Sequence, residues 1–98
     1  MKEEPHKPLP DLEKLVSGDM LNRGADLLER GSIISLDLSG QNAYLSKVRG
    51  TEEYTVDIVL DDNFRLFTHL CICPYKGGPI CKHKIATMLL IRSELEST

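Results

Sequence analysis

Cys71-Ile-Cys73-Pro-Tyr-Lys-Gly-Gly-Pro-Ile-Cys81-Lys-His83 is the stretch around which the rest of the chain is organised. It holds all three cysteines of the 98-residue chain and one of its three histidines, and an apolar helical pattern follows directly. The spacing C-x-C-x7-C-x-H brings three thiolates and one imidazole together, a donor set that suits tetrahedral Zn²⁺. We therefore predict one structural zinc ion, held by Cys71, Cys73, Cys81 and His83.

The expected secondary structure explains how this stretch can form a site. Residues two apart on a strand share a face, so Cys71 and Cys73 can both point to one metal as a strand ends. Cys81 is expected just before a helix and His83 in its first turn, where the helix N-terminus and nearby lysines favour the thiolate. Because the protein supplies all four ligands, no position is left for an activated water, and a structural role is preferred over a hydrolytic one.

Other interpretations of the cluster remain open. The cysteines can instead be small buried apolar residues, or one can act as a nucleophile beside a histidine, although nothing marks a third orienting group or an oxyanion site. His69 can replace His83 as a ligand, because it would share a strand face with Cys71 and Cys73. His6 lies in the proline-rich N-terminal segment and is expected to be solvated.

Helical periodicity marks the N-terminal part of the chain. Residues 12–16 are expected to form a short helix, ended by the Ser-Gly pair that follows. Asp19 is the expected N-cap of a second helix, in which apolar residues recur at helical spacing as far as Arg30. Gly31 is its expected C-terminal stop.

Beyond the second helix the apolar period changes to two, which indicates strands. In the first strand Ile34, Leu36 and Leu38 should share a face. The expected strands cover residues 33–38, 43–48, 53–60 and 64–70. Short turns separate them, so they should form an antiparallel meander. From Lys82 helical spacing returns as far as Leu95, for a helix that packs on the sheet.

Together these patterns predict an α+β fold: an N-terminal helix, a small antiparallel sheet of three to four strands, the zinc loop, and a C-terminal helix packed on the sheet. Residues 1–10 are charged or proline-rich and are expected to be a flexible tail, which leaves residues 11–98 as a single zinc-binding domain. A chain of this size buries only a modest core, so a metal is a sensible reinforcement.

The composition also indicates the cellular compartment in which the protein is expected. The first residues are charged and broken by prolines, unlike the continuous apolar core of a signal peptide, and no run reaches transmembrane length. Three cysteines clustered with a histidine fit a reducing compartment better than a disulfide framework. We therefore expect a cytoplasmic protein, or a nuclear one if the source has a nucleus, without a membrane partner.

The formal net charge is −3 and the pI is near 5.5, but the charges are unevenly distributed. Between Asn63 and Ser93 there is no acidic residue, and the basic residues of this range are Arg65, Lys76, Lys82, Lys84 and Arg92. The rest of the chain carries all 15 acidic residues against seven of the 12 basic ones, a balance of −8. Binding of one Zn²⁺ by three thiolates adds a charge of about −1 to this range. Residues 63–93, called the zinc half below, therefore stay positive.

The zinc stretch, with Lys-Ile-Ala after His83, resembles the SWIM zinc finger, whose pattern is C-x-C, a variable spacer, then C-x-H followed by a hydrophobic helix. Residues 21–36 also resemble the helix and small sheet that lead into prokaryotic SWIM fingers, so the resemblance covers about residues 20–95. It implies zinc bound by Cys71, Cys73, Cys81 and His83. The family occurs beside Swi2/Snf2-type helicases, in transposases, in a kinase-associated ubiquitin ligase and in partners of recombinase paralogues. The resemblance does not extend to a catalytic domain of those kinds, so we do not expect a helicase or transposase activity from these residues.

Two functions follow as expectations. The first is an adaptor that binds a protein partner, such as a DNA-processing ATPase or a recombinase paralogue, through a bipolar charge distribution suited to docking. The second is weak binding of DNA or RNA through the acid-free zinc half. The candidate residues for either contact are Arg65, Tyr75, Lys76, Lys82, Lys84 and Arg92. The lysines also have a plainer explanation, because they aid solubility and stabilise the thiolates.

Enzymatic activity is not expected. Candidate catalytic acids such as Asp57, Asp61 and Asp62 fall in a strand or a turn, where solvated charges are the ordinary explanation. No other constellation of catalytic side chains stands out in the sequence.

Overall fold

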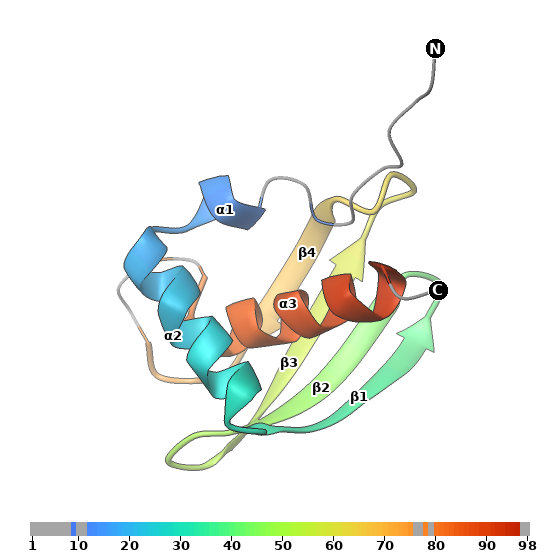
Figure 1. Cartoon of the computed structure of the whole chain (residues 1–98). Helices are drawn as coiled ribbons and strands as arrows, with labels where there is room; N and C mark the ends of the chain where they lie inside the picture. The colour runs from blue at the N-terminus through green and yellow to red at the C-terminus, as the bar shows by residue number, and fades with distance from the viewer. Residues whose placement is uncertain (1–8, 10–11, 76–77, 79, 97–98) are drawn as a thin grey trace.

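The computed structural model describes residue 9 and residues 12–75, 78 and 80–96. The helices and strands of this part of the chain are α1 (Leu12–Leu15), α2 (Gly18–Glu29), β1 (Ile33–Gly40), β2 (Ala43–Arg49), β3 (Glu53–Leu60), β4 (Leu66–Cys71) and α3 (Lys82–Glu96). The strands form one antiparallel sheet in the order β1-β2-β3-β4. Helix α3 crosses one face of the sheet, and α2 packs against α3 (Figure 1). The expected α+β fold is therefore confirmed.

The caps of α2 differ in part from the sequence-based expectation. Ser17 is the N-cap, and its hydroxyl accepts the backbone N–H of Met20 at 3.2 Å. The prediction of Asp19 as the N-cap is wrong, because Asp19 lies in the first turn of the helix and pairs with Arg23 at 3.2 Å. Gly31 follows the helix with φ of +74°, a left-handed conformation that glycine adopts without steric cost, and is the expected stop.

The sheet buries one face against the helices. Alternate residues of β3 point into the core, namely Tyr54, Val56, Ile58 and Leu60. Strand β1 breaks this alternation, because its register shifts between Ile33 and Ser35, which inserts Ile34 as a bulge. Ile33 and Leu36 then pack on the core, whereas Ile34 and Leu38 are 43% and 69% exposed. The expectation that Ile34 shares a face with Leu36 was wrong for this reason.

The fourth strand begins later than the sequence pattern suggests. Phe64 has φ of +61°, outside the extended region, so β4 starts at Leu66. The preceding turn is held by the Asp61 side chain, whose Oδ1 accepts the backbone N–H of Asn63 at 2.8 Å and of Arg65 at 3.0 Å. Such a side-chain turn competes with strand pairing, which explains the shorter strand.

Leu9 lies within the expected tail and belongs to the core, with 2% exposure. Its backbone N–H donates to the carbonyl of Phe64 at 2.8 Å, and its own carbonyl accepts from the guanidinium of Arg92 at 2.7 Å. The other residues of the range 1–10 lie outside the described part of the chain.

Helix α3 supplies the centre of the core. Ile85, Met88 and Ile91 have no exposed surface. Helix α2 approaches α3 closely at Gly24, where an added Cβ would clash with the side chain of Ile85. Within the described ranges, no helix combines the length and the apolar character that a membrane span needs.

A buried polar chain fixes the first turns of α3 to the sheet. The hydroxyls of Ser46 on β2 and Thr87 on α3 lie 2.7 Å apart, and Thr87 donates to the carbonyl of His83 at 3.0 Å. Because the Thr87 proton is used in that way, Ser46 is the donor to Thr87. These hydrogen bonds therefore fix the position of the start of α3 relative to strand β2.

Candidate metal centre

The four predicted ligands come from two elements that meet at one end of the sheet. Cys71 ends β4 and Cys73 lies two residues beyond it, while Cys81 directly precedes α3 and His83 lies in its first turn. Their ligand atoms all lie within 4.8 Å of one another. In a tetrahedral zinc site, bonds of about 2.3 Å to sulfur and 2.0 Å to nitrogen place ligand atoms about 3.5–3.8 Å apart. The cluster thus has the donor set of such a site and needs only a small contraction to reach its spacing.

Backbone amides support each of the three sulfurs. The N–H of Cys73 donates to the sulfur of Cys71, that of Tyr75 to Cys73, and that of Lys84 to Cys81. Hydrogen bonds to a sulfur favour its thiolate form, which is the form that coordinates a metal. The backbone is therefore arranged to stabilise three thiolates. This arrangement is more consistent with a metal site than with three buried neutral thiols.

Without a metal the three thiols differ in acidity. Burial raises the pKa of Cys71 to about 12 and also raises the pKa of Cys81. Burial acts in the same direction on Cys73, but the Tyr75 amide and the two neighbouring thiols outweigh it and lower the pKa of Cys73. Cys73 is thus the first of the three to ionise, and a bound cation must displace the protons of the other two.

His83 presents its two ring nitrogens to different surroundings. Nδ1 lies 4.0 Å from the sulfur of Cys71, which makes it the nitrogen that faces the cysteines. Burial, with Lys82 as a second cause, lowers the pKa of His83, so the imidazole is neutral at pH 7 and able to bind a metal. Its ring packs on that of Tyr54 with centroids 4.7 Å apart. Nε2 is buried and has no hydrogen-bond partner among the described residues.

The turn between β2 and β3 also touches the site, which sequence reasoning missed. An added Cβ at Gly50 would lie 3.1 Å from Nε2 of His83 and 3.0 Å from the ring of Tyr54. The only sequence signal was a glycine in a turn, which does not indicate what lies beside it.

His69, the alternative ligand, has another partner. Its Nδ1 lies 2.7 Å from Nζ of Lys84, and His69 is not among the four residues whose ligand atoms converge. Burial lowers the pKa of His69, and the positive charge of Lys84 lowers it further. A neutral His69 can accept a hydrogen bond from the Lys84 ammonium, so we place it beside the centre and not in it.

The candidate partner-binding residues do not form one exposed basic surface. Arg65 and Lys82 are exposed and Tyr75 is 39% exposed, whereas Lys84 and Arg92 are each only 8% exposed. Lys76 lies outside the described residues.

The burial of Arg92 has a structural cause. Its guanidinium donates to both carboxylate oxygens of Glu13, at 2.8 and 3.1 Å, as well as to the carbonyl of Leu9. This bidentate ion pair explains the presence of Arg92 without a role in binding a partner. The acid Asp61 likewise has a structural role, since it caps the turn before β4.

No family model matches the chain, and neither the curated proteins nor the solved structures contain a match. The assignment of a candidate metal centre therefore rests on the convergence of Cys71, Cys73, Cys81 and His83 in the fold.

Proposed function

We propose that this protein is a structural zinc-binding module of the SWIM type that acts as an adaptor for protein partners in DNA-processing assemblies. The observation that carries the zinc part is the convergence of three cysteine sulfurs and one imidazole nitrogen within 4.8 Å. Three sulfurs and one nitrogen from the protein complete a tetrahedral shell, so zinc here would stabilise the fold and would not activate water.

The mechanical role of the metal follows from where its ligands lie. Two come from the end of β4 and two from the start of α3, so a bound ion would tie the edge strand of the sheet to the helix that covers it. The connection between them holds the turn residues Pro74 and Gly78, and such turns order at a cost in conformational entropy. Zinc is therefore the group expected to fix this corner of the domain.

The surface near the centre supports a protein partner. Phe67, Leu70 and Ile72 are 69%, 57% and 70% exposed and lie on or just after β4, the edge strand that leads to the metal ligands. Large apolar side chains that are exposed on one short stretch of chain are consistent with an interaction surface. Burial of Lys84 and Arg92 removes two of the cations on which nucleic-acid binding through the zinc half would depend.

Metal analysis tests the zinc part. The purified protein should contain one zinc per chain, and substitution by Co²⁺ should give the intense visible bands of a tetrahedral site with three thiolates. Cys81→Ser should lose both signals, because it removes a ligand. Protein that carries no stoichiometric metal after reconstitution under reducing conditions would refute the proposal.

A comparison of partners tests the adaptor part. Zinc-loaded protein should recover a DNA-processing ATPase or recombinase-like protein from its native host, and Ile72→Ser together with Phe67→Ser should abolish that recovery without loss of zinc. Oligonucleotide titrations at low salt form the counter-test. Saturable binding that Lys82→Glu weakens would favour direct nucleic-acid recognition instead.

A further inference from the structure

Lys84 is a buried lysine beside the candidate metal centre. It lies in the first turn of α3, one residue after the ligand His83, and is 8% exposed. Its backbone N–H donates to the sulfur of the ligand Cys81. Lysine is almost never buried in this way unless its charge is paired. The burial of Lys84 therefore needs an explanation, which a role in solubility does not give.

The contacts of Lys84 direct its side chain toward the ligands. Lys84 follows Cys81 by three positions, so the two residues lie on the same side of the start of the helix. The ammonium nitrogen Nζ lies 2.7 Å from Nδ1 of His69 on β4. His69 and Cys71 both pair with buried residues of β3, so they share the face of β4 that is turned toward the helices. The ammonium is thus placed beside both elements that supply the ligands.

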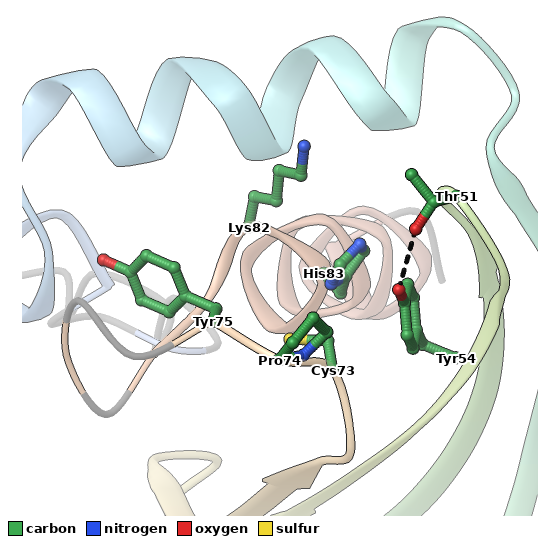
Figure 2. Close-up of a pocket in the computed structure, with 8 residues that line it drawn as sticks. Thr51, Tyr54, Cys73, Pro74, Tyr75, Lys82 and His83 are labelled. Atoms are coloured by element: carbon green, nitrogen blue, oxygen red, sulfur yellow. Dashed lines mark hydrogen bonds between the residues drawn. The ribbon is translucent and has the colours of Figure 1, made fainter.

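The two lysines of the first turn of α3 differ in where their charges lie. Burial acts to raise the pKa of Cys73, but the Tyr75 amide, the two neighbouring thiols and the positive charge of Lys84 lower it. Lys82 is exposed, and Figure 2 shows its side chain extending away from Cys73. The charge of Lys84 therefore acts on the sulfurs from a buried position, whereas that of Lys82 is surrounded by water.

A loaded centre would benefit from a nearby positive charge. One Zn²⁺, three thiolates and a neutral imidazole sum to a charge of about −1. The ligands Cys81 and His83 are 4% and 5% exposed, so part of this charge would be removed from water. Such burial is costly unless a charge of the opposite sign lies close by. The ammonium of Lys84 has both the sign and the position that are needed.

We propose that Lys84 is the buried counter-charge of the zinc centre, and that His69 is the positioning residue that holds its ammonium there. The ammonium offsets the negative charge of the three thiolates and thereby raises the affinity for zinc. This role rests on the proposed function, because only a bound divalent metal keeps all three thiols ionised. It deepens that function by naming two residues that help the centre to retain its metal.

The first test measures the zinc affinity of the full chain by competition with a chelator under reducing conditions. Lys84→Met nearly keeps the length of the side chain and removes its charge. It should weaken zinc binding at least about tenfold, as substitutions next to metal ligands commonly do. Lys82→Met is the matched control, since it removes the same charge from an exposed residue of the same helical turn. It should change the affinity by less than about threefold, because water screens that charge.

Cobalt spectra provide a readout that a purely structural role of Lys84 would not move. A positive charge beside the sulfurs lowers the energy of their lone pairs. In Co²⁺-loaded protein, Lys84→Met should therefore shift the sulfur-to-cobalt charge-transfer bands to longer wavelength, and Lys82→Met should leave them in place. The ligand-field bands, which report the tetrahedral geometry, should keep their positions in both variants. Displaced ligand-field bands with unmoved charge-transfer bands would overturn the proposal in favour of a structural role.

A double-mutant cycle tests the role of His69. His69→Leu should weaken zinc binding severalfold in the wild-type background and have no further effect in Lys84→Met, because His69 acts through the ammonium. Equal losses in the two backgrounds would show that it does not. If Lys84→Met alone fails to fold, the double variant carries the affinity measurement, since it replaces both hydrogen-bond partners by apolar side chains.

The outcomes separate the two proposals. A wild-type chain that binds no zinc refutes the proposed function. A wild-type chain that binds zinc no more tightly than Lys84→Met, or equal losses in Lys84→Met and Lys82→Met, refutes only the counter-charge.

Discussion

The two ends of α3 are attached to the rest of the molecule by different chemistry. At its start, Cys81 and His83 join two cysteines from the end of β4 in a candidate metal centre. About two and a half turns of helix further on, Arg92 forms the other attachment, in which it pairs with Glu13 and with the carbonyl of Leu9. The first attachment would need a bound metal and deprotonated thiols, whereas the second consists of groups of the described residues alone. A metal at the first attachment would make only that end of the helix sensitive to chelators and pH.

Removal of the metal should have the largest effect. Zinc binding to small sites contributes on the order of 10 kcal/mol, comparable with the whole stability of a domain. Chelation, or Cys81→Ser, should therefore unfold at least residues 70–95, as seen by hydrogen exchange and thermal unfolding. Excess zinc should restore the wild type but not the variant. If verified metal-free protein keeps the melting temperature of the loaded form, the metal end of α3 does not depend on a cofactor.

Loss of the arginine attachment should have the next largest effect. Arg92→Met should lower the free energy of unfolding by about 2–3 kcal/mol, because it removes a buried charge-assisted hydrogen bond to the Leu9 carbonyl and breaks the bidentate pair with Glu13. Glu13→Gln should cost less, since the Glu13 side chain is 49% exposed. Urea unfolding measures both, and zinc content should stay at one per chain. A parallel loss of zinc in Arg92→Met would show that the two ends are not independent.

The pH dependence should distinguish the two ends. At pH 7 His83 is neutral because its pKa is lowered. Cys71 and Cys81 are protonated at that pH in metal-free protein, both when residues 70–95 are unfolded and the thiols have ordinary pKa values of about 8.5 and in the folded geometry, where burial raises both pKa values. Zinc must displace these protons, so affinity falls as pH falls, by about tenfold per displaced proton per pH unit. Calorimetry in buffers of different ionisation enthalpy should show release of at least two protons. Release of none would contradict the thiol assignment.

A surface pair provides the smallest effect and a reference for the others. Arg23 and Asp19 pair at 3.2 Å on α2 with side chains 59% and 74% exposed. Arg23→Ala should change the free energy of unfolding by less than about 0.5 kcal/mol, because water screens such pairs. A change as large as that of Arg92→Met would mean that burial is not what gives the Arg92 pair its strength.

The features that the sequence predicts are those set by neighbouring residues. Two-residue alternation in β3 and the motif spacing around Cys71 and His83 depend on local geometry, so the strands, α3 and the convergent ligands could be expected. The bulge at Ile34 could not, since it is decided by the register with β2. The pairing of Arg92 with Glu13 spans 79 positions, and no local pattern marks it.

The same distinction explains the candidate binding residues. Counting charges along the chain groups Lys84 and Arg92 with the exposed Lys82, although their side chains are buried. Helix α3 is covered on one side by the sheet and on another by α2 (Figure 1). Lys84 lies against His69 of β4, and Arg92 lies against Glu13 of α1 and the carbonyl of Leu9, so basic residues on more than one face of α3 are removed from water. Linear charge distribution therefore overstates the basic surface.

The close approach of α2 and α3 has a consequence for sequence variation. A Cβ at Gly24 would collide with Ile85, so positions 24 and 85 share one volume. The clash involves the Cβ and the Cγ2 of Ile85 and lies close to the backbone of Ala86; valine keeps both of those atoms and alanine keeps the Cβ, so a smaller residue at position 85 does not make room for a side chain at position 24. In a randomised library selected for folded protein, glycine should therefore be retained at position 24 whatever residue occupies position 85.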